Sequence, residues 1–269
     1  MSVKRQPAFY LSHGGGPCFW IETPPPYGPH AYDDLRHYFE GMLASLPERP
    51  KAIVVISGHW EAKNFTVSAN PAPGMLFDYY GFPAHTYELS YPAKGDPVIA
   101  GRISELLAKA GISHETDTER GFDHGVFVPM LIVDPDGNIP VVMMSIREDF
   151  DPATHIAFGE ALAPLRDEGV VIIGSGSSYH NMTSFGDGKP QNARVFDTWL
   201  RGAVTQSEYG ARKAALLEWD QAPMARDAQP REDHLIPLMA VVGAGGADPA
   251  IVDFQGDMSG KAISGFRIG

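Results

Sequence analysis

Short apolar runs rich in β-branched residues alternate along this chain with longer stretches in which apolar residues recur every three or four positions. A brief run of uninterrupted apolar residues is typical of a strand that is buried on both faces of a sheet. The sequence therefore predicts strands at residues 8–12, 52–57, 139–146, 170–175 and 263–269.

The stretches between these runs have the apolar spacing of helices. This spacing predicts helices at residues 31–46, 96–110, 153–167, 192–206, 208–218 and 234–243. Alternating strands and helices favour an α/β fold with a mixed, mainly parallel central sheet flanked by helices on both faces. Because the 269 residues contain no internal repeat and no linker-like stretch, we expect residues 1–269 to form a single domain.

Three segments are rich in proline and glycine, at residues 21–29, 71–84 and 184–191. These residue types punctuate regular structure, so we expect long loops there. In a compact enzyme such loops often form the mouth of a functional site.

The charge balance limits the partners of the chain. It has 21 Lys and Arg residues against 33 Asp and Glu residues, a formal net charge of −12 and an isoelectric point of about 5.2. Nucleic acids and anionic membranes attract basic surfaces, so neither is an expected partner. No apolar run approaches the roughly 18 residues of a membrane span. We therefore expect the partner to be a small molecule.

Cysteine usage points to a reducing environment, because Cys18 is the only cysteine. A lone cysteine excludes an intramolecular disulfide and a cysteine-built zinc site. Since the sequence also has no secretory signal pattern, we expect a cytoplasmic protein. Cys18 itself is expected to be a small buried hydrophobe, with a nucleophilic role as the less favoured alternative.

Three histidines come directly or shortly after predicted strands. His13 follows AFYLS, His59 follows AIVVISG, and His180 follows VVIIGSGSSY. The carboxyl ends of parallel strands meet at one edge of a sheet, where ligands collect, so these imidazoles are expected to face one crevice. Neutral imidazole is the commonest protein ligand for zinc and a usual one for ferrous iron. The pattern therefore predicts a metal site.

Two further histidines have distinctive surroundings. His124 lies between glycines in GFDHG, and His234 precedes an apolar helical stretch in EDHLIPL. Each of these histidines has a purely structural alternative, such as a residue in an ordered turn or at a helix start that Asp233 caps. The remaining five histidines lack a comparable setting and are assigned to the surface or to packing, although the loop around His85 makes it a weak candidate for a pocket.

Several competing functions lack their motifs. The chain has no H-E-x-x-H helix of zinc proteases, no G-x-S-x-G elbow of serine hydrolases and no complete dinucleotide fingerprint. Two functions from other classes stay open on these residues alone. One is a zinc hydrolase that uses a metal-bound water, and the other is a non-catalytic metal-binding protein.

Five motifs in this order resemble the class III, or LigB-type, extradiol ring-cleaving dioxygenases, and are most similar to the branch that acts on DOPA. They are SHGGGP at 12–17, SGHW at 57–60, GFDHG at 121–125, SGSSYHN at 175–181 and EDHLIPL at 232–238. The segment YGFPAHTYELSYPAKGDP at 80–97 adds to the resemblance. It implies a mixed α/β sheet, a non-haem metal, and cleavage of a catechol-type ring with O₂.

The same resemblance implies roles for the five histidines. His13 and His59 match two metal-binding positions, and His234 matches the third. His180 matches a base that is a fourth ligand in zinc-containing relatives, so both roles stay open for it. His124 matches the second acid/base residue. The all-imidazole set suits Fe(II), expected for catalysis, and also Zn(II).

In the implied chemistry, His180 takes a proton from a catechol hydroxyl and His124 later returns one. The glycines at 14–16 are expected to let the backbone pass close to the metal and the ring. No substrate-binding residue is assigned, and a homodimer is a possible assembly. Five aromatic residues are candidates for a wall of the site: Trp60, Tyr79, Tyr80, Phe82 and Phe127.

Overall fold

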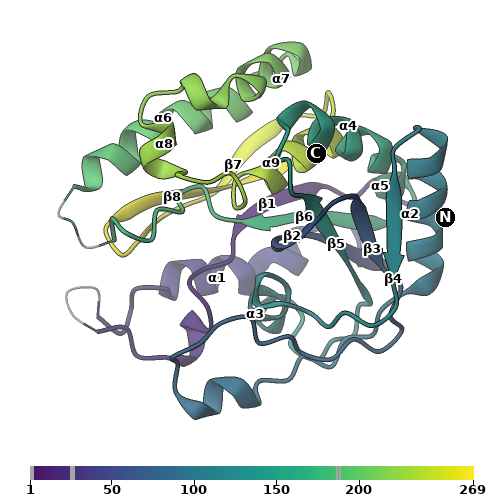
Figure 1. Ribbon diagram of the computed structural model, residues 1–269, viewed down its shortest axis with the longest axis horizontal. Coiled ribbons are helices and arrows are strands. Elements are labelled where there is room, and N and C mark those ends of the chain that lie inside the picture. Colours follow the sequence, from purple (N-terminus) through teal and green to yellow (C-terminus); the bar gives the residue numbers. More distant parts are fainter. Residues whose placement is uncertain (1–2, 25–27, 186, 188) are drawn as a thin grey trace.

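A computed structural model of the chain describes residues 3–24, 28–185, 187 and 189–269 (Figure 1). Within these ranges the strands form one eight-stranded sheet in the order β4-β3-β5-β2-β6-β1-β8-β7. The strands are β1 (Ala8–Ser12), β2 (Ala52–Ala62), β3 (Phe65–Ser68), β4 (His114–Asp117), β5 (Val141–Arg147), β6 (Val170–Gly176), β7 (Ala250–Met258) and β8 (Lys261–Ile268).

The centre of the sheet is parallel. Strands β5, β2, β6 and β1 are parallel neighbours, with Ser57 opposite both Ser145 and Ser175. Strands β8 and β7 continue the sheet in antiparallel pairing, and β3 pairs antiparallel with β5. The predicted α/β fold with a mixed, mainly parallel sheet is therefore confirmed.

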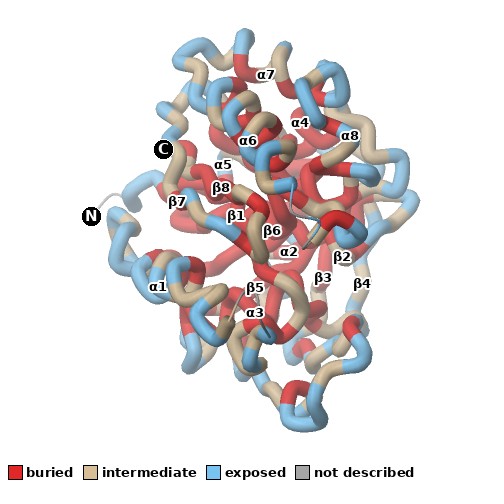
Figure 2. The backbone as a smooth tube through the Cα atoms, turned by 90° about the vertical axis from the view of Figure 1, so that its left-hand side faces the viewer, coloured by how far each residue is buried: buried red, intermediate tan, exposed pale blue. Residues whose placement is uncertain are grey.

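Helices cover both faces of this sheet, as Figure 1 shows. Helices α9, α4 and α6 lie on one face and α3 and α1 on the other. Buried residues concentrate in the sheet and in the helix sides next to it (Figure 2). The helices are α1 (Asp33–Met42), α2 (Pro97–Lys109), α3 (His124–Val133), α4 (Pro152–Leu162), α5 (Pro164–Asp167), α6 (Pro190–Val204), α7 (Tyr209–Leu217), α8 (Ala225–Ala228) and α9 (Ile236–Gly245).

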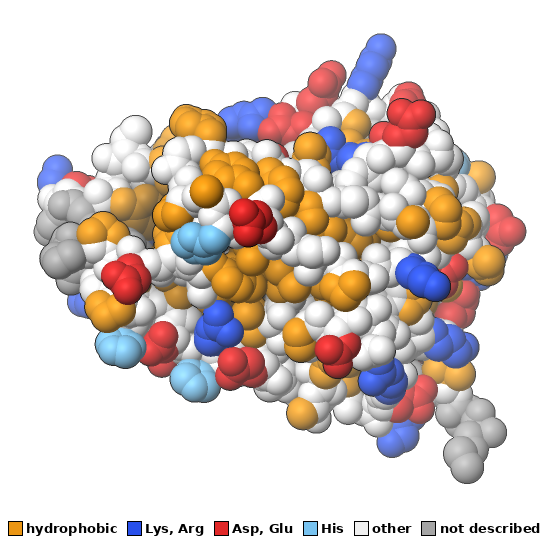
Figure 3. Space-filling model, turned by 90° about the horizontal axis from the view of Figure 1, so that it is seen from below, with side chains coloured by type: hydrophobic (Ala, Val, Ile, Leu, Met, Phe, Trp, Pro, Cys, Tyr) orange, Lys and Arg blue, Asp and Glu red, His pale blue; other side chains and the backbone are white. Residues whose placement is uncertain are grey.

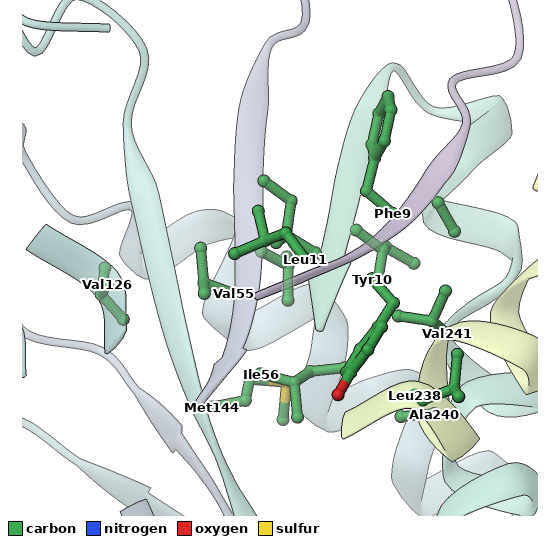
Figure 4. Packing of buried hydrophobic residues seen from close by; sticks show 14 of the residues in the cluster. Phe9, Tyr10, Leu11, Val55, Ile56, Val126, Met144, Leu238, Ala240 and Val241 are labelled. Carbon is green, nitrogen blue, oxygen red and sulfur yellow. The ribbon is translucent and has the colours of Figure 1, made fainter. Parts of the chain in front are cut away.

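Strand β1 shows why uninterrupted apolar runs mark this sheet. Successive side chains of a strand point to opposite faces. Tyr10 points toward α9, whereas Leu11 lies beside Val55 on the other side, and all three are buried (Figure 4). Because both faces carry helices, every position of β1 needs an apolar or internally bonded side chain.

Some elements were not predicted. Strand β4 has the polar sequence HETD at the sheet edge and is half exposed, so it has no apolar run. Helix α3 is apolar on all sides, so it lacks the alternation of apolar and polar faces that marks a helix. It also contains Pro129, a residue with low helix propensity. Strands β3 and β7 were also missed, and the predicted helix at 153–167 is divided into α4 and α5 at Pro164.

One of the three predicted loops lies wholly within the described residues. Residues 71–84 contain no helix or strand before the 3₁₀ turn at Ala84–Glu88, as expected for a loop. The loops at 21–29 and 184–191 include residues 25–27, 186 and 188, which lie outside the described residues. Among the described helices, none has the length and apolarity needed to cross a bilayer.

Candidate metal centre

The five singled-out histidines meet at the carboxyl ends of three adjacent strands. β6 lies between β1 and β2 in the sheet. His13 follows β1, His59 lies near the end of β2, and His180 follows β6. His124 begins α3, and His234 lies two residues before α9. The sequence predicts convergence of His13, His59 and His180, and the structure brings these three together with His124 and His234.

Three of these imidazoles point the same ring nitrogen at one place. The Nε2 atom of His59 lies 3.2 Å from Nε2 of His13 and 3.1 Å from Nε2 of His234. Nitrogens bound to one zinc ion at about 2.0–2.1 Å are themselves separated by about 3 Å. The spacing of the three Nε2 atoms therefore fits a set of ligands for a single ion.

The protonation chemistry of these side chains also fits a cation. Burial lowers the pKa of His13 and of His234 well below 6.5, and burial together with nearby His124 lowers the pKa of His59 to about 3. The rings are therefore neutral at pH 7 and carry free lone pairs. The buried Nδ1 atom of His13 has no hydrogen-bond partner among the described residues.

Glycine 176 allows His234 to enter the centre. A Cβ atom on Gly176 would lie 2.0 Å from the carbonyl oxygen of His234, so only glycine permits this approach. The same carbonyl accepts hydrogen bonds from Tyr10 Oη at 2.7 Å and from the backbone N–H of Ser177 at 3.1 Å. These contacts hold the His234 backbone against β6 and β1.

An irregularity in β2 aims His59 at the other histidines. The pairing of β2 with β5 shifts register between Ser57 and Glu61, a bulge-like irregularity that leaves residues 58–60 unpaired with β5. Ser57 Oγ accepts from the backbone N–H of His59 at 3.2 Å and donates to Asp123 Oδ1 at 2.8 Å. A Cβ atom on Gly58 would lie 2.8 Å from the carbonyl oxygen of Asp233. The bulge and these contacts fix the direction of His59.

His124 packs against two of the three converging histidines. Its ring centroid is 3.9 Å from that of His59 and 5.2 Å from that of His13. Its Nδ1–H donates to Asp78 Oδ1 at 2.7 Å, and its backbone N–H donates to the same oxygen at 3.0 Å. The sequence interpretation of His124 as a turn residue is replaced by a position at the first turn of α3.

His180 stacks on His234. The ring centroids are 3.3 Å apart and the planes differ by 17°. Asp233 lies next to both rings. Its Oδ2 atom is 2.8 Å from His234 Nδ1 and 3.9 Å from His180 Nδ1. Burial lowers the pKa of His180, so this ring is also neutral at pH 7.

The glycine-rich turn after β1 has a different local role from the expected one. Gly14 and Gly16 have φ values of +89° and +53°, which side chains rarely adopt. A Cβ atom on Gly14 would collide with Cys18 Sγ at 2.5 Å, and one on Gly16 would lie 3.0 Å from the Phe82 ring. Turn conformation and contact with Cys18 and Phe82 therefore account for these two glycines.

Other predicted side chains have mixed outcomes. Cys18 is buried, which raises the pKa of its thiol to about 12 and supports packing over nucleophilic chemistry. Tyr79 is buried with its ring centroid 5.8 Å from that of His124. Tyr80 is 91% exposed and so forms no part of an enclosed wall. His85 is exposed and bonds to the carbonyl oxygen of Trp20.

Sequence reasoning missed two carboxylates that bond to the histidines. Asp78 was noticed only as part of the loop at 71–84, although that loop was expected at the mouth of a site. The sequence offers Asp233 as a helix cap, whereas its carboxylate bonds to His234 Nδ1. The hydrogen bond that Asp78 accepts spans 46 positions in the chain, so no local pattern indicates it.

Comparisons with known proteins agree on one family. The family described as the catalytic LigB subunit of aromatic ring-opening dioxygenase matches residues 7–262. The chain is 38% identical over 243 residues to "4,5-DOPA dioxygenase extradiol" of Beta vulgaris, covering 88% of this chain and 86% of the relative. It is 35% identical over 261 residues to "Dioxygenase tasH" of Hapsidospora irregularis, covering 88% and 78% of the two chains.

A solved structure is also similar over its whole length. The crystal structure of an uncharacterised protein from Escherichia coli K12 has a TM-score of 0.77 and 28% sequence identity to this chain. The match covers 98% of this chain and 100% of the other. These similarities give no support to the alternatives of a zinc hydrolase or a non-catalytic metal-binding protein.

Proposed function

Since the chain belongs to the LigB family and is a ring-cleaving extradiol dioxygenase, we propose that its substrate is a catechol and that a metal ion is required. The proposed ligands are His13, His59 and His234. Relatives named for 4,5-DOPA cleavage make a DOPA-like catechol the first substrate to test.

The observation that supports this proposal best is the convergence of three neutral Nε2 atoms at 3.1 and 3.2 Å. Three protein ligands leave coordination positions for both oxygens of a catechol and for O₂. We propose Fe(II) as the catalytic ion, with Zn(II) as a second ion for the same ligands. When bound, the metal orients the two reactants and provides the electronic path between them.

His180 is the proposed base. Its Nδ1 atom faces Asp233, so Nε2 is left to accept a proton from a catechol hydroxyl. The lowered pKa of His180 keeps this ring unprotonated before the substrate arrives. Removing the hydroxyl proton makes the catechol ring a better electron donor.

His124 is the proposed second acid/base residue. Its Nδ1–H is bonded to Asp78, so Nε2 is the atom that can take up and return a proton. The His124 ring lies against those of the proposed ligands His59 and His13, which supports a role beside them. In this role His124 gives a proton to an oxygen atom as the substrate ring opens.

The decisive experiment reconstitutes metal-free protein under anaerobic conditions with Fe(II), with Zn(II) or with no metal. Each sample then receives air and a panel of catechols that includes DOPA. We expect O₂ uptake and the yellow colour of a ring-opened semialdehyde with Fe(II) only. Stoichiometric O₂ uptake without metal would contradict metal dependence, and no uptake with any catechol would contradict the proposed substrate class.

Location and assembly stay predictions. A homodimer is testable by light scattering of the purified protein. The face seen from below in Figure 3, which carries α1 and α3, shows hydrophobic side chains gathered near its centre with charged groups of both signs around them. A cytoplasmic location is expected because Cys18 is the only cysteine of the sequence, and cell fractionation tests it.

A further inference from the structure

Asp78 is the one carboxylate of the proline- and glycine-rich loop at 71–84 that reaches the histidine cluster. Its Oδ1 atom accepts two hydrogen bonds from His124, one from the backbone N–H and one from Nδ1–H. Its Oδ2 atom lies 3.5 Å from Nδ1 of His59. A single side chain therefore faces one proposed metal ligand and one proposed acid/base residue.

The loop delivers Asp78 to this place through backbone contacts. Met75 forms a short parallel bridge with Phe122, and the backbone N–H of Leu76 donates to the carbonyl oxygen of Phe122 at 2.7 Å. A Cβ atom on Gly121 would lie 2.5 Å from the carbonyl oxygen of Gly74, so glycine at 121 permits the contact. The position of Asp78 is thus fixed by the segment that precedes His124.

The contact with His124 determines which ring nitrogen carries its proton. Oδ1 of Asp78 accepts from the backbone N–H of His124 at 3.0 Å and lies 2.7 Å from Nδ1 of the same residue. A carboxylate only accepts hydrogen bonds, so Nδ1 of His124 must be the donor. The neutral ring then keeps its lone pair on Nε2, which is the atom needed for proton transfer.

The contact with His59 has a related effect on metal binding. His59 directs Nε2 toward His13 and His234, so its proton is on Nδ1, facing Oδ2 of Asp78. A carboxylate partner on the far nitrogen orients a ligating imidazole and makes it a stronger ligand. Asp233 makes the corresponding contact with His234, at the shorter distance of 2.8 Å.

We propose that Asp78 is a positioning residue shared by His124 and His59: it holds His124 with its proton on Nδ1 and orients His59 for the metal. This inference rests on the proposed function, because that function assigns the roles of the two histidines. Its consequences for tautomer and metal affinity are nevertheless measurable without any catechol.

Two substitutions separate the two contacts. In Asp78→Asn the amide oxygen still accepts from both donors of His124, so the amide N–H₂ group is turned toward the protonated Nδ1 of His59. Two hydrogen-bond donors, the amide N–H₂ group and the Nδ1–H of His59, then face each other, so the contact with His59 is lost. In Asp78→Ala both contacts are lost. The full-length protein loaded with Zn(II) suits nitrogen-15 NMR of the histidine rings, and chelator competition gives its Zn(II) affinity.

In Asp78→Asn we expect His124 to keep its proton on Nδ1 and the dissociation constant for Zn(II) to rise about tenfold. In Asp78→Ala we expect the same loss of affinity together with a change of the His124 tautomer. Asp96→Ala is the matched control, because Oδ1 of Asp96 likewise accepts two hydrogen bonds at a helix start, in this case from the backbone N–H groups of Val98 and Ile99. It should change neither readout.

The proposal is overturned if Asp78→Ala leaves both the tautomer of His124 and the Zn(II) affinity unchanged. If the alanine variant does not fold, Asp78→Asn decides alone. An unchanged Zn(II) affinity in that variant overturns the proposed effect of Asp78 on His59. Absence of dioxygenase activity with every catechol would count against the proposed function and leave both of these measurements valid.

Discussion

The imidazole ring of His180 lies parallel to that of His234, with centroids 3.3 Å apart and planes inclined by 17°. A metal ion binds to imidazole in the plane of the ring, along the nitrogen lone pair. Two planes so close to parallel meet only far beyond bonding distance, so one ion does not lie in both. Because the geometry at His234 suits a ligand, the stacking favours His180 as a base over a fourth ligand.

Substitution of His180 tests this geometric argument. His180→Gln is expected to retain Fe(II) with nearly unchanged affinity and to lower kcat by about 10²–10⁴, the usual contribution of a positioned acid or base. Chelator competition measures the first quantity and O₂ uptake the second. A large loss of Fe(II) affinity in His180→Gln would instead identify His180 as a ligand.

Substitution of His124 is expected to leave the metal in place as well. His124→Ala removes the proposed proton donor but none of the three converging Nε2 atoms. We expect normal metal content by elemental analysis and a loss of about 10²–10⁴ in kcat. His85→Ala, an exposed histidine outside the cluster, serves as the control and should keep full activity. Full activity in His124→Ala would disprove the assignment.

Gly176 is expected to be irreplaceable at the metal centre. In Gly176→Ala the new Cβ atom would overlap the His234 carbonyl oxygen at 2.0 Å. Moving this backbone costs about 1–3 kcal/mol of unfolding free energy and displaces a ligand, so both Tm and metal affinity should fall. Gly202→Ala in α6 is the control, because its Cβ meets nothing within 4 Å, and it should stabilise the protein by about 0.5–1 kcal/mol.

Acid should destabilise the protein partly through a histidine outside the cluster. His155 accepts from Arg147 N–H through Nε2 and bonds to the carbonyl oxygen of Asp151 through Nδ1. Burial lowers the pKa of His155 from 6.5 to about 4. The unfolded chain therefore binds a proton that the folded protein does not, between these pH values. The contribution of neutral His155 to the free energy of unfolding is fully present above pH 6.5 and is lost as the pH falls toward 4.

The measurement is the free energy of unfolding by urea at several pH values. Removing His155 with His155→Gln should reduce the slope of stability against pH by up to about 1.4 kcal/mol per pH unit in this window. The slope above pH 7 should not change. Equal slopes between pH 4 and 6.5 in both proteins would show that His155 titrates normally.

The central strands could be predicted because burial on both faces requires uninterrupted apolar residues. The edge strand β4 could not, because His114 to Asp117 pair through the backbone while their side chains face solvent or the rim. Helix α3 was missed for the opposite reason. Its complete burial removes the polar face that makes a helix recognisable.

The histidines could be predicted because the geometry of parallel strands carries His13, His59 and His180 to one edge. His234 and His124 needed the motif resemblance, since neither follows a central strand. Asp78 could not be found in this way, because its role depends on a contact with His124, which lies 46 positions further along the chain. Long-range loop contacts leave no periodic pattern in the sequence.

The order of strands in the sheet has a consequence for synthesis of the chain. In the sheet, β1 lies between β6 and β8, which both follow it at a long distance in the sequence. The proposed ligands His13 and His234 are 221 positions apart in the sequence, so they can meet only after the residues between them have been synthesised. Such non-local topologies fold slowly. Metal uptake would therefore report that these two distant segments have come together, and chains truncated before His234 should remain unable to hold the ion.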